Sequence, residues 1–194
     1  MGTATHDDDH DKHSVGASGP GWVPMEPLPS SEMFLAAFGG KPPLTAVDIL
    51  DPAFDLVACQ RQYRRAYEVL GSDTASADKL RHAASELVVA QTDIEFLVAI
   101  IDDAVAERLQ QYRRQRGRAA SRVRTDVVGE IALHTESIGE IAARMADLWE
   151  AVTAKTKRPG GDEISEARQL VDLCQGYDCL AAEVETGRRQ LPGV

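Results

Sequence analysis

Apolar residues recur at alternating steps of three and four residues along most of this chain, and this spacing constrains the fold more than any other feature. The clearest example runs from Val127 to Val152, where the one polar residue on the stripe is His134. Its apolar members are Val127, Ile131, Ile138, Ile141, Met145, Leu148 and Val152. Because such steps place side chains on one face of a helix, which is then buried against other helices, we predict a long core helix here.

The start of this helix is ambiguous. Ser137 and Glu140 fit a capping box, which would begin a helix at Ser137 and leave residues 126–135 as a separate turn or helix. The alternative is one helix over residues 126–157 with an irregularity near Thr135. We prefer the single helix.

The longest periodic segment runs from Asp78 to Arg116. Its stripe also contains a single polar residue, Gln91, among Leu80, Ala84, Leu87, Ile94, Val98, Ile101 and Val105. At 1.5 Å per residue an unbroken helix of this length would extend about 58 Å, which is rare in a compact domain. We therefore expect a kink, fraying near Arg116, or an extended bundle.

Three more segments carry helix signals. Ser30 and Ser31 can cap a short helix that ends at Phe38. After one turn at residues 45–50, Asp51-Pro52 can start a helix that ends at Leu70, with Phe54 inside and with Arg61, Arg64 and Arg65 facing water. The last helix spans residues 162–187, with Cys174 on its apolar face.

The composition agrees with a helical fold. Aromatic residues make up only 5% of the chain, alanine, leucine, glutamate and arginine are abundant, and no segment shows a strand signal. We predict an all-α protein: an antiparallel four-helix bundle with long core helices, a short extra N-terminal helix and a disordered N-terminal tail. The tail comprises residues 1–29, and the helical domain comprises residues 30–194.

The net charge of −10 argues against nucleic acid and anionic membranes as partners. No stretch approaches twenty apolar residues and no basic leader precedes one, so we expect a cytoplasmic protein with no membrane partner. Three cysteines are too few for a disulfide framework. The His- and Asp-rich run at residues 6–13 contains metal-ligand types, but an unstructured tail gives no fixed geometry, and we interpret it as solvated.

Arginines cluster where the long helix is expected to break at Gly117. The anion-binding candidates are Arg113, Arg114, Arg116 and Arg118. The preferred interpretation is that these cations complement a helix C-terminus and keep a connecting loop in solvent. Only Tyr112 is available there to stack on a base.

One motif suggests a family. The run Leu133-His134-Thr135-Glu136-Ser137-Ile138-Gly139, with Arg144-Met145 downstream, resembles the signature of DUF4254, a family of bacterial proteins of unknown function. The resemblance covers roughly residues 31–192; it implies a helical domain and no established activity. This chain has Ala143 where the family more often carries Asp before the arginine.

His134 is the main candidate for chemistry. With Glu136 and Arg144 it could line a polar pocket for a small ligand or act as a general base, and Gln91 is its expected neighbour across an antiparallel helix pair. The alternative, which we prefer, is a hydrogen-bonded histidine that fixes helix register. The di-iron spacing, zinc spacings, phosphate loops and nucleophile elbows are absent, so we expect no metal, no cofactor and no catalytic residue.

The leading functional hypothesis is a non-enzymatic helical interaction or scaffold protein of coiled-coil character. It would self-associate as a homo-oligomer or bind another helical protein, because two apolar stripes of such length exceed what short helices can cover within one subunit. The alternative is a small-molecule-binding protein or enzyme with its site at His134, Glu136 and Arg144.

Overall fold

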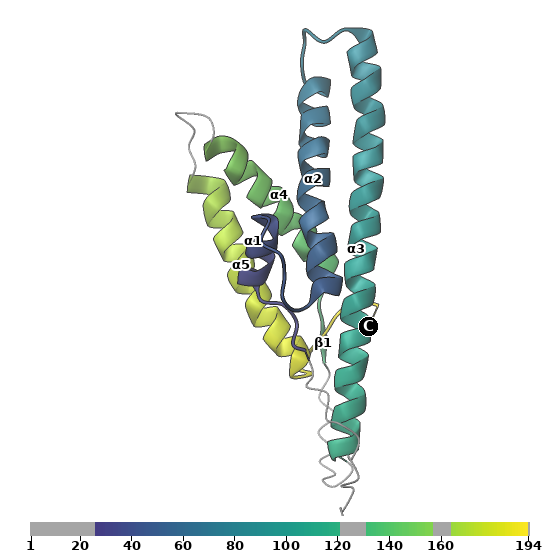
Figure 1. Ribbon diagram of the computed structural model, residues 1–194, viewed down its shortest axis with the longest axis vertical. Coiled ribbons are helices and arrows are strands. Elements are labelled where there is room, and N and C mark those ends of the chain that lie inside the picture. Colours follow the sequence, from purple (N-terminus) through teal and green to yellow (C-terminus); the bar gives the residue numbers. More distant parts are fainter. Residues whose placement is uncertain (1–25, 121–130, 157–163, 194) are drawn as a thin grey trace, which may run out of the picture.

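The computed structural model describes residues 26–120, 131–156 and 164–193 and is mostly helical, which confirms the predicted class (Figure 1). In chain order the elements are α1 (Ser31–Phe38), α2 (Val47–Leu70), α3 (Ala77–Ala120), β1 (Ala132–Leu133), α4 (Ile138–Thr156), α5 (Ile164–Glu185) and β2 (Arg189–Gln190). None of these described helices is both long and apolar enough to cross a membrane.

The four long helices form two antiparallel hairpins. Figure 1 shows α2 and α3 side by side, with α4 and α5 tilted away from them and α1 lying in the wedge between the pairs. Helix α4 contacts both α2 and α3, whereas α5 packs mainly on α4 and α1. This arrangement does not confirm the predicted antiparallel four-helix bundle.

The core lies where α1 meets the two hairpins. Tyr177 of α5 is fully buried and packs edge-to-face on Phe34 of α1, with ring centroids 5.5 Å apart. Its hydroxyl donates a hydrogen bond to the Pro29 carbonyl oxygen at 2.6 Å. A buried hydroxyl that finds a carbonyl acceptor avoids the free-energy cost of an unpaired polar group, so this contact orients α1 against α5.

Arg108, on α3, fastens the segment before α1 to the domain. Its buried guanidinium donates to both Asp48 carboxylate oxygens and to the Pro27 carbonyl, and it forms an ion pair with Glu26 at 3.1 Å. Burial by itself lowers the pKa of Arg108, but the bonds to Asp48 and Glu26 outweigh burial and raise it. Residues 26–29, which the sequence assigns to the tail, therefore pack on the helical domain.

The longest predicted helix is confirmed, and its expected break is wrong. Helix α3 continues without interruption through Gly117 to Ala120, about 66 Å at the standard rise. Helix α2 begins at Val47 rather than Asp51, so Pro52 lies inside it. Phe54 is 49% exposed instead of facing the core, because the buried side of α2 is formed by other residues, among them Ile49, Ala53 and Leu56.

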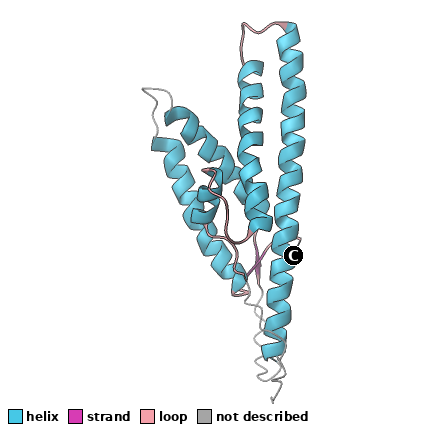
Figure 2. Cartoon of the chain, in the orientation of Figure 1, coloured by secondary structure: helices cyan, strands magenta, loops and turns pink. Residues whose placement is uncertain are grey.

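The single helix preferred for residues 126–157 is also wrong. Ala132 and Leu133 form a short strand that pairs in parallel with Arg189 and Gln190, shown in magenta in Figure 2, and α4 begins only at Ile138. Ile131 is 53% exposed, although the spacing placed it on the core stripe. Residues 127–130 lie outside the described part of the chain, as does the His- and Asp-rich run at residues 6–13.

Candidate functional site

The residues of the sequence motif meet at the start of α4. Ser137 and Glu140 form the predicted capping box: the Ser137 hydroxyl accepts from the Glu140 backbone N–H at 3.1 Å, and the Glu140 carboxylate accepts from the Ser137 backbone N–H at 2.7 Å. This reciprocal pair satisfies backbone donors that a helix N-terminus otherwise leaves free. The capping box, and not the apolar spacing, decides where the helix begins.

His134 stabilises the turn that leads into α4. Its ring Nδ1 lies 3.2 Å from the backbone nitrogen and 2.9 Å from the carbonyl oxygen of Glu136, and the tautomer decides which bond forms. Its backbone N–H donates to the Gln190 carbonyl at 2.8 Å, which extends the pairing of β1 with β2. One ring nitrogen of the half-buried His134 is therefore already used within the turn.

Glu136 and Arg144 meet, as the pocket hypothesis requires. The Arg144 Nη1 atom donates to both Glu136 carboxylate oxygens, at 2.7 and 2.8 Å. The Arg144 and Glu136 side chains are 56% and 37% exposed, so water screens the pair and it contributes less than about 1 kcal/mol to stability. Their contact ties the turn to the second turn of α4.

The predicted contact between Gln91 and His134 is wrong. Gln91 is exposed on α3 and donates to Glu95 on its own helix at 2.8 Å. The start of α4 instead meets α3 at Val98 and Asp102, about 10 and 16 Å farther along the helix axis than Gln91. Counting residues from a shared loop misplaced the register because part of the connection is a strand rather than helix.

Gly139 allows this close approach of α4 to α3. A Cβ atom at Gly139 would lie 2.5 Å from the Val98 carbonyl oxygen, closer than any real side chain tolerates. The Gly139 backbone N–H donates to the Asp102 carboxylate at 2.8 Å. Burial raises the pKa of Asp102, although its bonds to Ser137 and Gly139 oppose that shift. Sequence reasoning missed this pair; the available signal was a glycine within the first turn after a capping residue.

The arginine cluster is only partly described. Arg113 and Arg114 are exposed on the last third of α3, and Arg113 borders a cleft of about 250 Å³ beside β2. The side chains of Arg116 and Arg118 lie outside the described part of the structure. Anion binding by these arginines stays a prediction.

A second polar region, missed from the sequence, lies between α2, α4 and α5. It is a cleft of about 400 Å³ whose charged lining residues are Arg61, Arg64, Arg65, Glu68, Glu150, Lys155 and Glu166. Arg61 and Arg64 were expected to face water only. Instead Arg61 donates to both Glu150 carboxylate oxygens, at 2.8 and 2.9 Å, and Arg64 bonds Asp147 at 2.7 Å.

Several charges of this cleft are paired with one another, while the buried Oε2 atom of Glu166 has no hydrogen-bond partner among the described residues. The Glu150 side chain is only 10% exposed, and its hydrogen bond raises the pKa of Arg61. Lys155 pairs with Glu166 and lowers the pKa of that carboxyl. Within the described residues, no group of His, Cys, Asp and Glu side chains could hold a metal ion. The cleft therefore joins α2 to the second hairpin through ion pairs.

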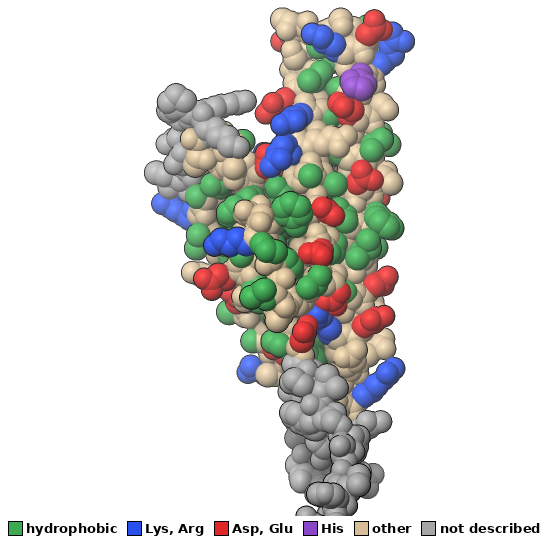
Figure 3. Space-filling model, in the orientation of Figure 1, with side chains coloured by type: hydrophobic (Ala, Val, Ile, Leu, Met, Phe, Trp, Pro, Cys, Tyr) green, Lys and Arg blue, Asp and Glu red, His purple; other side chains and the backbone are tan. Residues whose placement is uncertain are grey.

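A surface with exposed apolar side chains was also missed. We name it the outer face of α3 and define it by exposed residues that share one side of the helix: Arg81, Ser85, Val88, Thr92, Phe96, Ala99 and Asp103. Val88 and Phe96 are 63% and 65% exposed. Figure 3 shows hydrophobic side chains along the right-hand edge of the molecule, which α3 forms. The signal was a second apolar spacing, opposite the one that predicts the core face.

Comparison with known proteins identifies no relative: no protein-family model, no curated protein and no solved structure matches this chain.

Proposed function

We propose that this chain is a helical interaction protein that associates with itself through the outer face of α3. The observation that carries the proposal is the exposure of Val88 and Phe96 at the centre of a helix face that no other described element covers (Figure 1). Burying such a side chain is worth about 1.5–3 kcal/mol, so a partner that covered both would gain substantially.

The opposite face of α3 packs against other helices of the same chain. Ala83, Ala90 and Ile101 are buried in the contact of α3 with the other helices. A helix that is apolar on two opposite sides is typical of one covered from both sides. Among residues 26–120, 131–156 and 164–193, helices pack on the inner side while Val88 and Phe96 of the outer side stay exposed, which supports an intermolecular role for the outer side.

The polar regions support this choice by elimination. At the start of α4, Asp102, Glu136 and Arg144 are hydrogen-bonded within the fold, and in the cleft beside α2 Arg61 pairs with Glu150 and Lys155 pairs with Glu166. Paired groups of this kind stabilise a fold, and a catalytic site needs groups left available to a substrate. The small-molecule site at His134, Glu136 and Arg144 remains the alternative.

The arrangement of the four long helices and the family resemblance lead to two further proposals. We infer that the four long helices are a splayed variant of an antiparallel bundle, since consecutive long helices run in opposite directions (Figure 1). We also retain the resemblance to the DUF4254 family of bacterial proteins, with a cytoplasmic location. The motif residues from Leu133 to Gly139 support this resemblance. The structure of a family member would test it, because we expect that structure to have a glycine packed at the same helix junction.

The test of self-association is the mass in solution. We expect wild-type protein at micromolar concentration to sediment as an oligomer and Phe96→Glu to sediment as a monomer with unchanged helicity. Val171→Glu is the matched control, because Val171 is 54% exposed but lies on α5. A wild-type protein that stays monomeric would remove the proposal, and so would equal effects of the two variants.

A further inference from the structure

We infer that the partner on the outer face of α3 is a second copy of this chain, packed antiparallel with the two-fold axis at Thr92. This inference rests on the proposed function and adds the orientation and register of the contact. A two-fold interface is isologous, so each residue of the face must meet a suitable residue at the mirrored position.

The spacing of the outer face is symmetric about Thr92. Val88 and Phe96 lie four residues before and after it, and Ser85 and Ala99 lie seven residues before and after it. In an antiparallel copy centred on Thr92, each Val88 therefore opposes Phe96 of the second copy. The side chains of Val88 and Phe96 then pack against each other near the centre of the interface. Ser85 and Ala99 oppose each other farther out, and because both are small they allow the two helices to approach closely.

The spacing also suits two straight helices. From Ser85 the steps are three, four and four residues and then begin again at Phe96, which is an eleven-residue repeat. This repeat averages about 3.67 residues per turn, close to the 3.6 of a straight helix, so the stripe runs nearly along the axis of α3. The two copies of α3 can then remain in contact over the whole face without strong supercoiling.

Thr92 can lie on the two-fold axis without an unpaired hydroxyl. Its Oγ1 atom donates to the Val88 carbonyl oxygen of the same helix at 2.9 Å. A polar atom satisfied within its own helix need not find a partner across an apolar contact. The side chain therefore tolerates burial at the centre of the interface.

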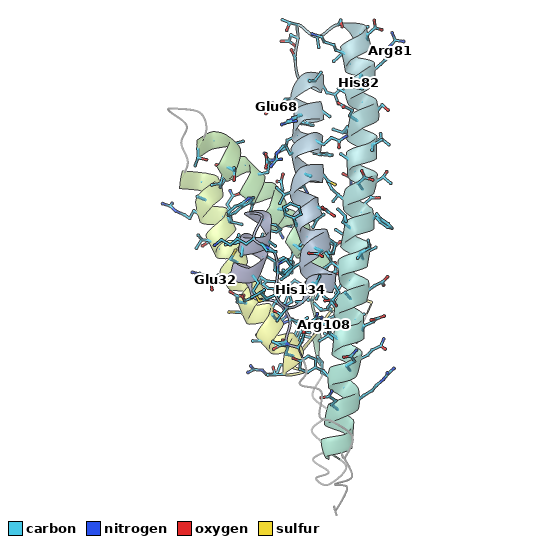
Figure 4. The ribbon with its side chains drawn as sticks, viewed as in Figure 1. Glu32, Glu68, Arg81, His82, Arg108 and His134 are labelled. Carbon is cyan, nitrogen blue, oxygen red and sulfur yellow. The ribbon has the colours of Figure 1, made fainter. Side chains whose placement is uncertain are left out.

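The charges at the two ends favour the antiparallel orientation. Arg81 lies eleven residues before Thr92, near the beginning of α3 in Figure 4, and Asp103 lies eleven residues after it. In the antiparallel dimer each Arg81 opposes Asp103 of the other copy, whereas a parallel dimer would place like charges together. In the monomer Arg81 pairs with Asp78 on its own exposed helix turn. Such end charges contribute little affinity, but they select orientation.

Cysteine cross-linking tests the register. We expect Thr92→Cys, in a Cys179→Ser background that removes the exposed cysteine, to form a covalent dimer under mild oxidation. Val88→Cys in the same background should not, because the two copies of residue 88 would lie about 12 Å apart along the axis and a disulfide requires Cα atoms within about 7 Å. The mixture of Val88→Cys and Phe96→Cys proteins should cross-link again.

The outcomes separate this inference from the proposed function. Cross-linking of both single variants indicates a parallel dimer and overturns the antiparallel arrangement. A wild-type oligomer in which Thr92→Cys never cross-links overturns the register and leaves self-association standing. A monomeric wild type overturns both.

A charge exchange gives a second readout. Arg81→Glu alone and Asp103→Arg alone should each raise the dimer dissociation constant about fivefold, because like charges then face each other twice per dimer. The double variant should return it to within about twofold of wild type. A double variant at least as weak as the two single ones would contradict the antiparallel pairing.

Discussion

The start of α4 and the outer face of α3 differ in how their side chains are used. At the start of α4, Ser137, Glu140, His134 and Gly139 each make a contact that fixes the turn or its packing on α3. On the outer face, Val88 and Phe96 lie in solvent. The first region carries the most specific motif of the sequence, and the second carries no motif.

This difference separates residues that stabilise the fold from residues that are available to bind a partner. A motif whose side chains bond one another serves local folding, which here means starting a helix in direct contact with a neighbouring helix. Exposed apolar side chains on a well-formed helix, uncovered by the described part of the chain, are typical of a surface that binds a partner. The comparison predicts that substitutions at the start of α4 change stability, whereas substitutions on the outer face change association.

The largest expected effect is at Gly139. Gly139→Ala places a Cβ against the Val98 carbonyl, so α4 must shift, and we expect the free energy of unfolding to fall by about 3 kcal/mol in urea titrations. Gly176→Ala on α5 is the control: its Cβ would meet no atom within 4 Å, and the better helix former should raise stability by about 0.5–1 kcal/mol. Equal effects would show that the close approach of α4 to α3 is absent.

The next effect is at His134. His134→Ala removes the ring that bonds the Glu136 backbone, and we expect a loss of about 1 kcal/mol, measured as a lower melting temperature. The oligomer mass should be unchanged, because the turn is remote from the outer face. If the alternative function holds, the variant would instead keep its melting temperature and lose binding of a small ligand.

Asp102→Asn sharpens the comparison through pH. The folded-state pKa of Asp102 is raised, chiefly by burial, so the folded state of the wild-type protein is more stable when this carboxyl is protonated than when it is ionised. As pH rises from the ordinary aspartate pKa of about 3.9 through the raised value, wild type should lose stability relative to Asp102→Asn, whose amide oxygen can still accept from Gly139. Unfolding titrations at several acidic pH values measure the difference in the free energy of unfolding between the two proteins. This difference should not change with pH if Asp102 is not buried.

The smallest effect on the monomer is at Phe96. Phe96→Ala should change the free energy of unfolding by less than about 0.5 kcal/mol at concentrations where the protein is monomeric, because the ring is mostly exposed. The same variant should still weaken association in sedimentation experiments. A large loss of monomer stability would place Phe96 in an intramolecular contact and break the comparison.

Periodicity and capping residues predicted most elements of this fold. Ser30 caps α1, the long periodic segment is α3, and the capping box at Ser137 marks the start of α4. The preference for one longer helix failed because β1 pairs with Arg189 and Gln190, more than fifty residues later, and no local pattern of two residues announces such a pairing. At the candidate site, the sequence indicated that Glu136 and Arg144 were related but placed Gln91 wrongly.

The sequence by itself determined which residues share a helix face, because the period of the helix is a local property of the backbone. Only the tertiary structure decided what each face meets. Arg61 and Arg64 pair with α4 because the second hairpin leans against α2, and Val88 and Phe96 remain in water because α2 and α4 lie on other sides of α3. Those choices depend on how whole helices cross, which is set by packing between distant parts of the chain.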